Sequence, residues 1–206
     1  AFKALGLLGN DDTARQIAPL IRQWPGEGGH ARAVTGLDVL AAIGSDVALM
    51  HLNGIAQKVK FKGLQDAARE KINLIAEAKG LTPEELADRL VPDLGLEEDG
   101  TLQLDFGPRT FIVGFDETLK PSVRDNAGKL LPDLPKPNSK DDAAKSKEAV
   151  DTWKILKKDV KTIASQQVTR LEMAMCSSRR WTAEVFQLFL AGHPLLQHLV
   201  RRLVWG

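Results

Sequence analysis

The chain has 206 residues, with 28 Lys and Arg against 27 Asp and Glu and a net charge of +1. This balance excludes the overall basicity of a dedicated nucleic-acid-binding protein, and 43% apolar residues with one cysteine exclude collagen-like, disulfide-rich and broadly disordered chains. No membrane-length apolar run or signal-peptide pattern occurs, and a lone Cys176 suits a reducing compartment, so the sequence predicts a cytoplasmic protein without a membrane segment.

Residues 1–91 are predicted to form a helical-repeat region of the HEAT-like, solenoid type. Gly9 and Gly44 end two apolar segments and stand 35 residues apart. Each is followed two residues later by an aspartate, Asp11 or Asp46, that is suited to cap the next helix. A weaker third copy follows, and a period of this length made of helix pairs is typical of α-solenoids. Because such repeats bury their apolar faces against neighbouring repeats, the chain is expected to be a fragment of a larger protein with further repeats upstream.

Five helices are expected in this region, over residues 13–23, 31–43, 46–59, 63–79 and 83–90. Pro19 lies inside the first helix and predicts a kink or an early end, because proline lacks the backbone donor that a helix interior needs. The last helix follows a clear N-terminal signature, with Thr82 as the cap, Pro83 in the first turn and Glu85 three residues after the cap.

The hydrophobic period changes to two within residues 100–135, which predicts a small antiparallel β-sheet. Segments 101–106 and 110–115 alternate in polarity on either side of a Gly-Pro turn, as the strands of a hairpin do. A second turn at 125–128 lies between two further short segments, so three or four strands are expected. A sheet of this size needs a helix over its apolar face.

Residues 136–149 are predicted to be a linker, because prolines precede a run of charged side chains. Residues 150–206 are predicted to form a C-terminal helical unit that is truncated at its end. It is expected to contain a long helix to about residue 178, a short helix after Thr182 and a last helix from His193. The apolar stripe of the long helix is expected to consist of Trp153, Leu156, Val160, Ile163, Val168, Leu171 and Met175. The predicted fold class is therefore mainly α, of the α+β kind.

Basic side chains concentrate in the last third, where residues 151–206 carry nine Lys and Arg against four Asp and Glu. Four lysines recur at spacings of three and four, which places them in one stripe along the long helix. The candidate contacts for phosphates or for an acidic partner are Lys154, Lys157, Lys158, Lys161, Arg179 and Arg180. The alternative interpretation is an ordinary solvated helix face. No aromatic residues interleave with the stripe, so the pattern does not indicate base stacking.

Signatures of catalysis or metal binding do not occur in the sequence. Gly26, Gly28 and Gly29 match neither a phosphate-binding loop nor a dinucleotide fingerprint. His193 and His198 are five residues apart, a poor spacing for two ligands on one helix face, and no paired-cysteine spacing exists. We therefore predict no catalytic residue, no metal ligand and no cofactor.

An ordered string of residues runs through the last third, namely Gln167–Met175, Arg179–Trp181, Phe186, His193–Leu195 and Leu203–Trp205. Segments 105–109, 115–117, 119–121 and 134–137 belong to the same pattern. Over about residues 100–206 this resembles a bacterial domain of unknown function found in MolR-like proteins, which are large proteins described as molybdate metabolism regulators and often carry a WGR domain. The most distinctive positions are Arg170, Glu172, Arg179, Trp181, His193, Pro194 and Trp205. The resemblance implies helical repeats before the domain and no specific reaction.

The leading hypothesis is a non-enzymatic scaffold or regulatory fragment of a larger bacterial MolR-like protein, which binds a protein partner through its helical-repeat surface. One alternative is a nucleic-acid-associated transcriptional regulator that places the basic C-terminal third on phosphates. Another is part of an enzyme whose site is completed by sequence outside this chain. Salt-dependent DNA binding would separate the first two, because phosphate contacts give a steep salt slope.

Overall fold

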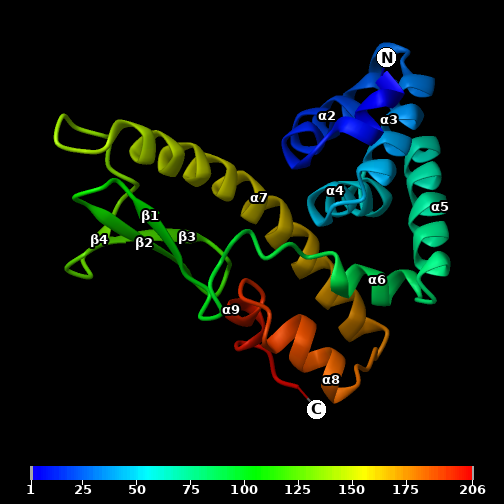
Figure 1. The fold of residues 1–206 in the computed structure, drawn as a ribbon. Helices are drawn as coiled ribbons and strands as arrows, with labels where there is room; N and C mark the ends of the chain where they lie inside the picture. Colours follow the sequence, from blue (N-terminus) through cyan, green and yellow to red (C-terminus); the bar gives the residue numbers. More distant parts are fainter. Residues whose placement is uncertain (1, 206) are drawn as a thin grey trace. The chain divides into compact units, whose positions relative to one another are not determined.

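The computed structural model describes residues 2–205, which form two compact units, Ala1–Pro92 (unit 1) and Asp93–Gly206 (unit 2). Ala1 and Gly206, the ends of the first and last predicted segments, lie outside the described residues. Helices predominate and are accompanied by one small antiparallel sheet (Figure 1), so the predicted mainly α fold class is confirmed. None of the helices within residues 2–205 has the length and apolar character needed to cross a membrane.

Unit 1 is entirely helical in its described part. In chain order its elements are η1 (Phe2–Ala4), α1 (Leu5–Leu8), α2 (Asp11–Gln23), η2 (Trp24–Glu27), α3 (His30–Ile43), α4 (Asp46–Gln57), α5 (Lys62–Ala78) and α6 (Pro83–Arg89). Helix α3 contacts α2, α4 and α5, and these contacts bury Ile21, Leu37 and Leu52 completely. The predicted helices are confirmed to within two residues at most of their ends, because their apolar stripes follow the helical period.

The caps of α2 and α4 differ from the prediction by one residue. Asn10 Oδ1 accepts from the Thr13 backbone N–H at 3.1 Å, and Ser45 Oγ accepts from the Ala48 N–H at 3.3 Å. Asp11 and Asp46, which were expected to be the caps, instead occupy the first helical turn, where a negative charge is favoured by the helix dipole. The 35-residue repeat is kept, because the two true caps have the same spacing.

Helix α2 continues through Pro19 to Gln23, so the expected early end is wrong. Burial of the inner face of α2 against α3 and α4 outweighs the backbone donor that proline lacks. The capping box at the start of α6 is confirmed. Thr82 Oγ1 accepts from the Glu85 N–H at 3.2 Å, and Glu85 Oε2 accepts from the Thr82 N–H at 2.8 Å.

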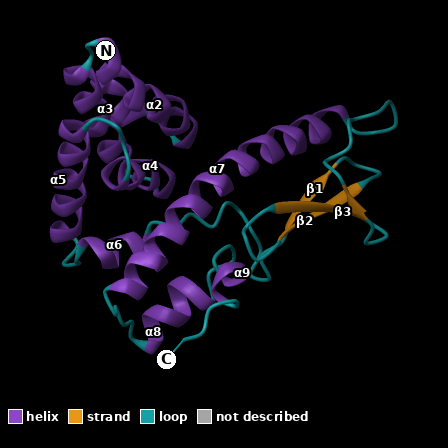
Figure 2. Ribbon diagram, turned by 180° about the vertical axis from the view of Figure 1, so that it is seen from behind, coloured by secondary structure: helices purple, strands orange, loops and turns teal. Residues whose placement is uncertain are grey.

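Unit 2 begins with the predicted sheet, whose strands are β1 (Leu102–Asp105), β2 (Thr110–Phe115), β3 (Pro121–Asp125) and β4 (Leu130–Leu131). All neighbours pair antiparallel in chain order, with Leu104 opposite Phe111. The inward face holds Leu104, Phe111 and Val113, each at most 3% exposed. The long helix α7 (Ala143–Cys176) packs on β1 and supplies the expected helical cover (Figure 2).

Helix α7 begins at Ala143, so residues 143–149 are helical where a linker was predicted. The Asp142 carboxylate caps the helix by accepting from the Ala144 and Lys145 N–H groups, both at 2.9 Å. The preceding residues are held to the sheet by an ion pair between Arg109 Nη2 and Asp141 Oδ2 at 2.6 Å. The Arg109–Asp141 ion pair joins residues 32 positions apart, and a local charge and proline pattern does not reveal it.

The apolar stripe of α7 follows the prediction at five positions and departs from it at two; the five buried side chains are Trp153, Leu156, Val160, Ile163 and Leu171. Val168 and Met175 were expected to be buried but are 41% and 75% exposed. The buried line continues through Gln167, Arg170 and Ala174, as a period of 3.6 residues requires. Gln167 and Arg170 are polar, so a pattern of apolar residues does not identify them as buried positions.

The end of unit 2 consists of α8 (Ala183–Phe186), the π-helical segment η3 (Gln187–Ala191) and α9 (Gln197–Val200). Thr182 caps α8 as predicted, since its Oγ1 accepts from the Val185 N–H at 3.3 Å. The last helix starts later than the expected His193–Pro194. His193 is buried, and its Nδ1 accepts from the Leu195 and Leu196 N–H groups at 3.1 and 3.2 Å, which stabilises a turn before α9.

Candidate binding groove

The predicted lysine stripe on α7 is half neutralised. Lys154 Nζ pairs with Asp151 at 3.1 Å, and Lys157 Nζ pairs with Asp133 at 3.2 Å while lying 4.9 Å from the Trp153 ring centroid. The Trp153 indole, which donates to Asp133 at 2.6 Å, is the main cause of the lowered pKa of that carboxyl. Lys158 and Lys161 are exposed and form no ion pair with another described residue. The stripe therefore presents less charge than its sequence suggests.

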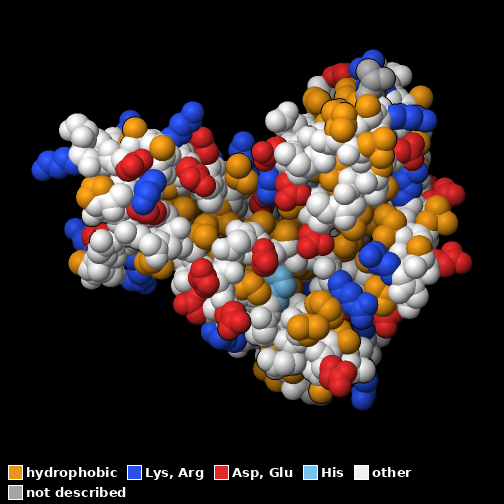
Figure 3. Space-filling model, in the orientation of Figure 1, with side chains coloured by type: hydrophobic (Ala, Val, Ile, Leu, Met, Phe, Trp, Pro, Cys, Tyr) orange, Lys and Arg blue, Asp and Glu red, His pale blue; other side chains and the backbone are white. Residues whose placement is uncertain are grey.

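Mixed charge also characterises the surface over the sheet. In Figure 3, Lys and Arg side chains alternate with Asp and Glu over the strands and the start of α7. Ion pairs join Arg109 with Asp141 and Lys145 with Asp105 in this part of unit 2. This part of unit 2 thus lacks the one-sided positive field that a phosphate backbone favours.

Arg179 and Arg180 lie away from the lysine stripe, at an apolar groove of about 940 Å³ near the end of unit 2. The groove is formed by the last turns of α7, the segment leading into α8, α8 itself, Leu199 of α9 and the residues that follow α9. Its apolar lining includes Val168, Leu171, Met175, Trp181, Phe186, Leu199, Leu203 and Trp205. A concave, mostly apolar site with a few charged groups is the usual form of a binding site.

Three aromatic side chains, Trp181, Phe186 and Trp205, form the aromatic cluster of this groove. The Trp205 ring centroid lies 4.7 Å from that of Phe186 and 5.8 Å from that of Trp181, and both contacts are edge-to-face. The Trp205 indole N–H donates to the Val200 carbonyl at 3.1 Å, which fixes the ring. The guanidinium of Arg179 lies 4.8 Å from the centre of the Trp181 ring. The cluster is therefore rigid, and its rings meet edge to face.

Exposed apolar side chains concentrate around the groove. Of the 13 large apolar side chains that are exposed within residues 2–205, seven fall between Val168 and Trp205. They include Met175 at 75%, which lines the groove, and Leu188 at 65%, which does not. Apolar side chains are also visible over α8 and the C-terminal end of the chain in Figure 3. The five that line the groove are Val168, Met175, Leu203, Val204 and Trp205, and exposed apolar side chains gathered at one site are typical of an interaction surface.

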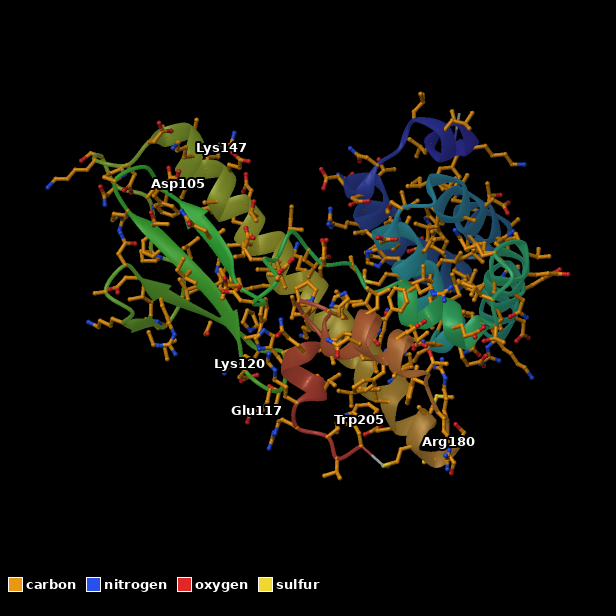
Figure 4. All side chains as sticks on the ribbon, turned by 60° about the horizontal axis from the view of Figure 1, so that its bottom comes forward. Asp105, Glu117, Lys120, Lys147, Arg180 and Trp205 are labelled. Atoms are coloured by element: carbon orange, nitrogen blue, oxygen red, sulfur yellow. The ribbon has the colours of Figure 1, made fainter. Side chains whose placement is uncertain are left out.

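The charge of the groove comes from two arginines and one acid. Arg180 is exposed and forms no ion pair or hydrogen bond with another described residue. Glu172 is the acidic residue of the lining. Arg170 is buried close by; burial, and then the neighbouring Arg179, lowers its pKa to about 10. Figure 4 shows Arg180 and Trp205 on neighbouring segments at this end of unit 2.

The structure gathers part of the motif string at the groove. Glu172, Arg179, Trp181 and Trp205 line it, whereas Arg170 is buried and donates from Nε to Gln167 Oε1 at 2.7 Å. His193 and Pro194 do not line the groove. The sequence does not mark the remaining wall residues, such as Leu199, as part of a binding site. Their apolar pattern predicts only the core positions of a short helix. Leu171 is buried, and Trp181 and Phe186 pack against Trp205, so these groove-lining side chains also contribute to packing at this end of unit 2.

Metal-ligating side chains do not cluster in the described part of the chain: no three His, Cys, Asp or Glu residues between 2 and 205 are placed to hold an ion. Cys176, at the end of α7, is exposed. The chemistry available at the groove is therefore apolar contact together with the arginine and carboxylate charges.

Comparison with known proteins gives two similarities. Residues 128–206 match the family model "Domain of unknown function (DUF4132)", which covers the groove and all of α7. The whole chain is 42% identical over 206 residues to the "Uncharacterized protein YehI" of Escherichia coli (strain K12), and it spans 17% of the length of that relative. No solved structure matches the chain.

Proposed function

We propose that this chain is a non-enzymatic, partner-binding part of a larger cytoplasmic bacterial protein, and that the groove of unit 2 receives a segment of a protein partner. The observation that carries the proposal is that five exposed apolar side chains line one groove together with the aromatic cluster. Tryptophan and arginine are the side chains most enriched among those that dominate protein-binding energies.

The larger assignment rests on the comparisons and on the residue pattern. The relative YehI is about six times as long as this chain, which supports a role within a larger polypeptide. The motif string resembles the domain of MolR-like proteins, and we propose that the larger protein is a scaffold or regulator of that group, with a WGR domain elsewhere. We place the binding site at the groove rather than on the helical-repeat surface of unit 1, because the groove combines apolar area, packed aromatic rings and the exposed guanidinium of Arg180.

Replacing Trp205 with Ala tests the proposal. Peptides selected from a displayed random library on the whole chain are expected to bind the Trp205→Ala variant at least about tenfold more weakly, because the substitution removes the central ring of the aromatic cluster. Leu188→Ala is the matched control: Leu188 is 65% exposed in the same unit but is not part of the groove lining, so its loss is expected to change affinity less than about twofold. Failure to select any peptide, or equal binding to both variants, would contradict the proposal.

Nucleic-acid binding is the second candidate, and three of the six predicted phosphate contacts favour it, because Lys158, Lys161 and Arg180 are exposed and form no ion pair among the described residues. Because Lys154 and Lys157 are already paired with carboxylates, we expect no micromolar binding of mixed-sequence duplex DNA even at 50 mM salt. A salt series in fluorescence anisotropy measures this directly. Micromolar affinity that falls steeply with salt would favour the regulator on DNA over the protein-binding scaffold.

A further inference from the structure

We infer that the groove selects a protein segment in which an acidic side chain stands beside an apolar anchor, with Arg180 as the counter-charge. This inference rests on the proposed function, since it names the chemistry of the partner that the same groove binds. It is carried by two independent features, namely the geometry of the aromatic cluster and the charge at the rim.

The aromatic cluster favours inserted side chains over stacked bases. Trp205 meets both Phe186 and Trp181 with interplanar angles of 66° and 78°, and the Arg179 guanidinium lies over the Trp181 ring. Recognition of single-stranded nucleic acid needs open ring faces on which successive bases stack. The edge-to-face rings line the groove instead, and the exposed Met175 in the same lining is a flexible, polarisable side chain suited to packing against aliphatic or aromatic anchors.

The rim charge favours an anionic partner. Arg179 already lies over the Trp181 ring, whereas Arg180 is exposed and has no ion-pair partner among residues 2–205. Glu172 is the one acidic side chain in the lining, against two arginines. A carboxylate on the partner would form an ion pair with the guanidinium of Arg180. The apolar side chains around this ion pair would exclude water and strengthen it.

The acid of the partner must be a single side chain among apolar ones rather than one of many phosphates. The lining is mainly apolar, and Glu172 would repel a continuous polyanion passing over the groove. A segment with one or two acidic residues next to Leu, Ile, Phe or Trp satisfies both features. A short amphipathic helix laid into a groove is a common form of such a segment.

Charge reversal at Arg180 tests the inference. Peptides selected from a displayed random library on the whole chain are expected to be enriched in Asp or Glu beside an apolar residue, and to bind the Arg180→Glu variant about tenfold more weakly. Lys147→Glu is the matched control, because Lys147 makes the same charge change at an exposed position near the start of α7, outside the lining (Figure 4). Its effect is expected to stay below about twofold, since separated surface charges are screened.

The peptide side supplies the complementary variant. Replacing the acidic residue of a selected peptide by Gln or Asn is expected to weaken binding to the wild-type chain and to make binding insensitive to Arg180→Glu. Peptides that lose affinity on Trp205→Ala but bind Arg180→Glu as tightly as wild type would overturn this inference and leave the proposed function standing. Peptides insensitive to Trp205→Ala would overturn both.

Discussion

Replacing Phe106 with Ala is expected to lower the free energy of unfolding of unit 2 by about 3–5 kcal/mol, the usual cost of removing a fully buried aromatic ring. The Phe106 side chain is 0% exposed, and its ring centroid lies 5.0 Å from that of Phe111 in an edge-to-face contact. The Arg109 guanidinium lies 5.3 Å and 5.4 Å from the two ring centres, and it also pairs with Asp141. Truncation thus leaves a cavity beneath the contacts that hold the start of α7 to the sheet.

Urea denaturation followed by circular dichroism measures this loss. Ile112→Ala is the matched control on the same sheet: Ile112 is 36% exposed on the strand that carries Phe111, and its truncation is expected to cost about 1 kcal/mol or less. The Phe106 variant is also expected to fray the start of α7, because the Phe106 carbonyl accepts from the Asp142 N–H at 2.9 Å. A loss no greater than that of the Ile112 variant would refute the assignment of Phe106 to the core.

Acidification from pH 6.5 to pH 4 is expected to destabilise unit 1 by about 3 kcal/mol through His51 alone. Burial, and then the positive charges of Arg22 and Arg15, lowers the pKa of His51 from 6.5 to about 4. Its Nε2 is buried without a hydrogen-bond partner in the described structure, so the neutral ring is the form that the fold accepts. Below pH 6.5 the unfolded chain takes up a proton that the folded chain refuses, so the free energy of unfolding falls as the pH falls toward 4.

His51→Leu is expected to remove most of this slope, because Leu does not titrate and suits the buried site. His30→Gln provides the control in the same unit, since His30 is exposed, and it is expected to keep the wild-type dependence. Chemical denaturation at several pH values between 4 and 7 gives the comparison. An unchanged slope in His51→Leu would show that another group governs acid stability in this range.

Local patterns account for most of the fold. The period of two around Gly107 and Pro108 predicted the hairpin, and the helical period with its caps predicted the helices of unit 1, because these signals act over a few residues. The departures come from longer-range contacts. Arg109 pairs with Asp141 across 32 positions and so orders a segment whose sequence predicted a linker. Gln167 and Arg170 occupy buried helix positions that a hydrophobic pattern assigns to solvent.

The candidate site was less predictable than the fold. The sequence singled out two arginines by charge and one tryptophan by its place in the motif string. The structure places all three, Arg179, Arg180 and Trp181, at the groove. The groove itself has no sequence signature, since it depends on Met175 facing outward and on the chain returning after α9 to place Trp205 against Phe186. The lysine stripe carries less unpaired positive charge in the structure than the sequence indicates. Asp133, 24 positions before Lys157, pairs with Lys157 and neutralises part of the stripe.

The indole N–H region of the ¹⁵N spectrum tests the central claim without altering the groove. The chain has four tryptophans, Trp24, Trp153, Trp181 and Trp205, and single substitutions assign their signals. On titration with a selected peptide that carries an acidic residue beside an apolar anchor, the Trp181 and Trp205 signals are expected to shift while those of Trp24 and Trp153 stay in place. Shifts confined to Trp24 would place the binding site on unit 1, and shifts confined to Trp153 would place it on the lysine stripe of α7; either would contradict the groove as the partner-binding site.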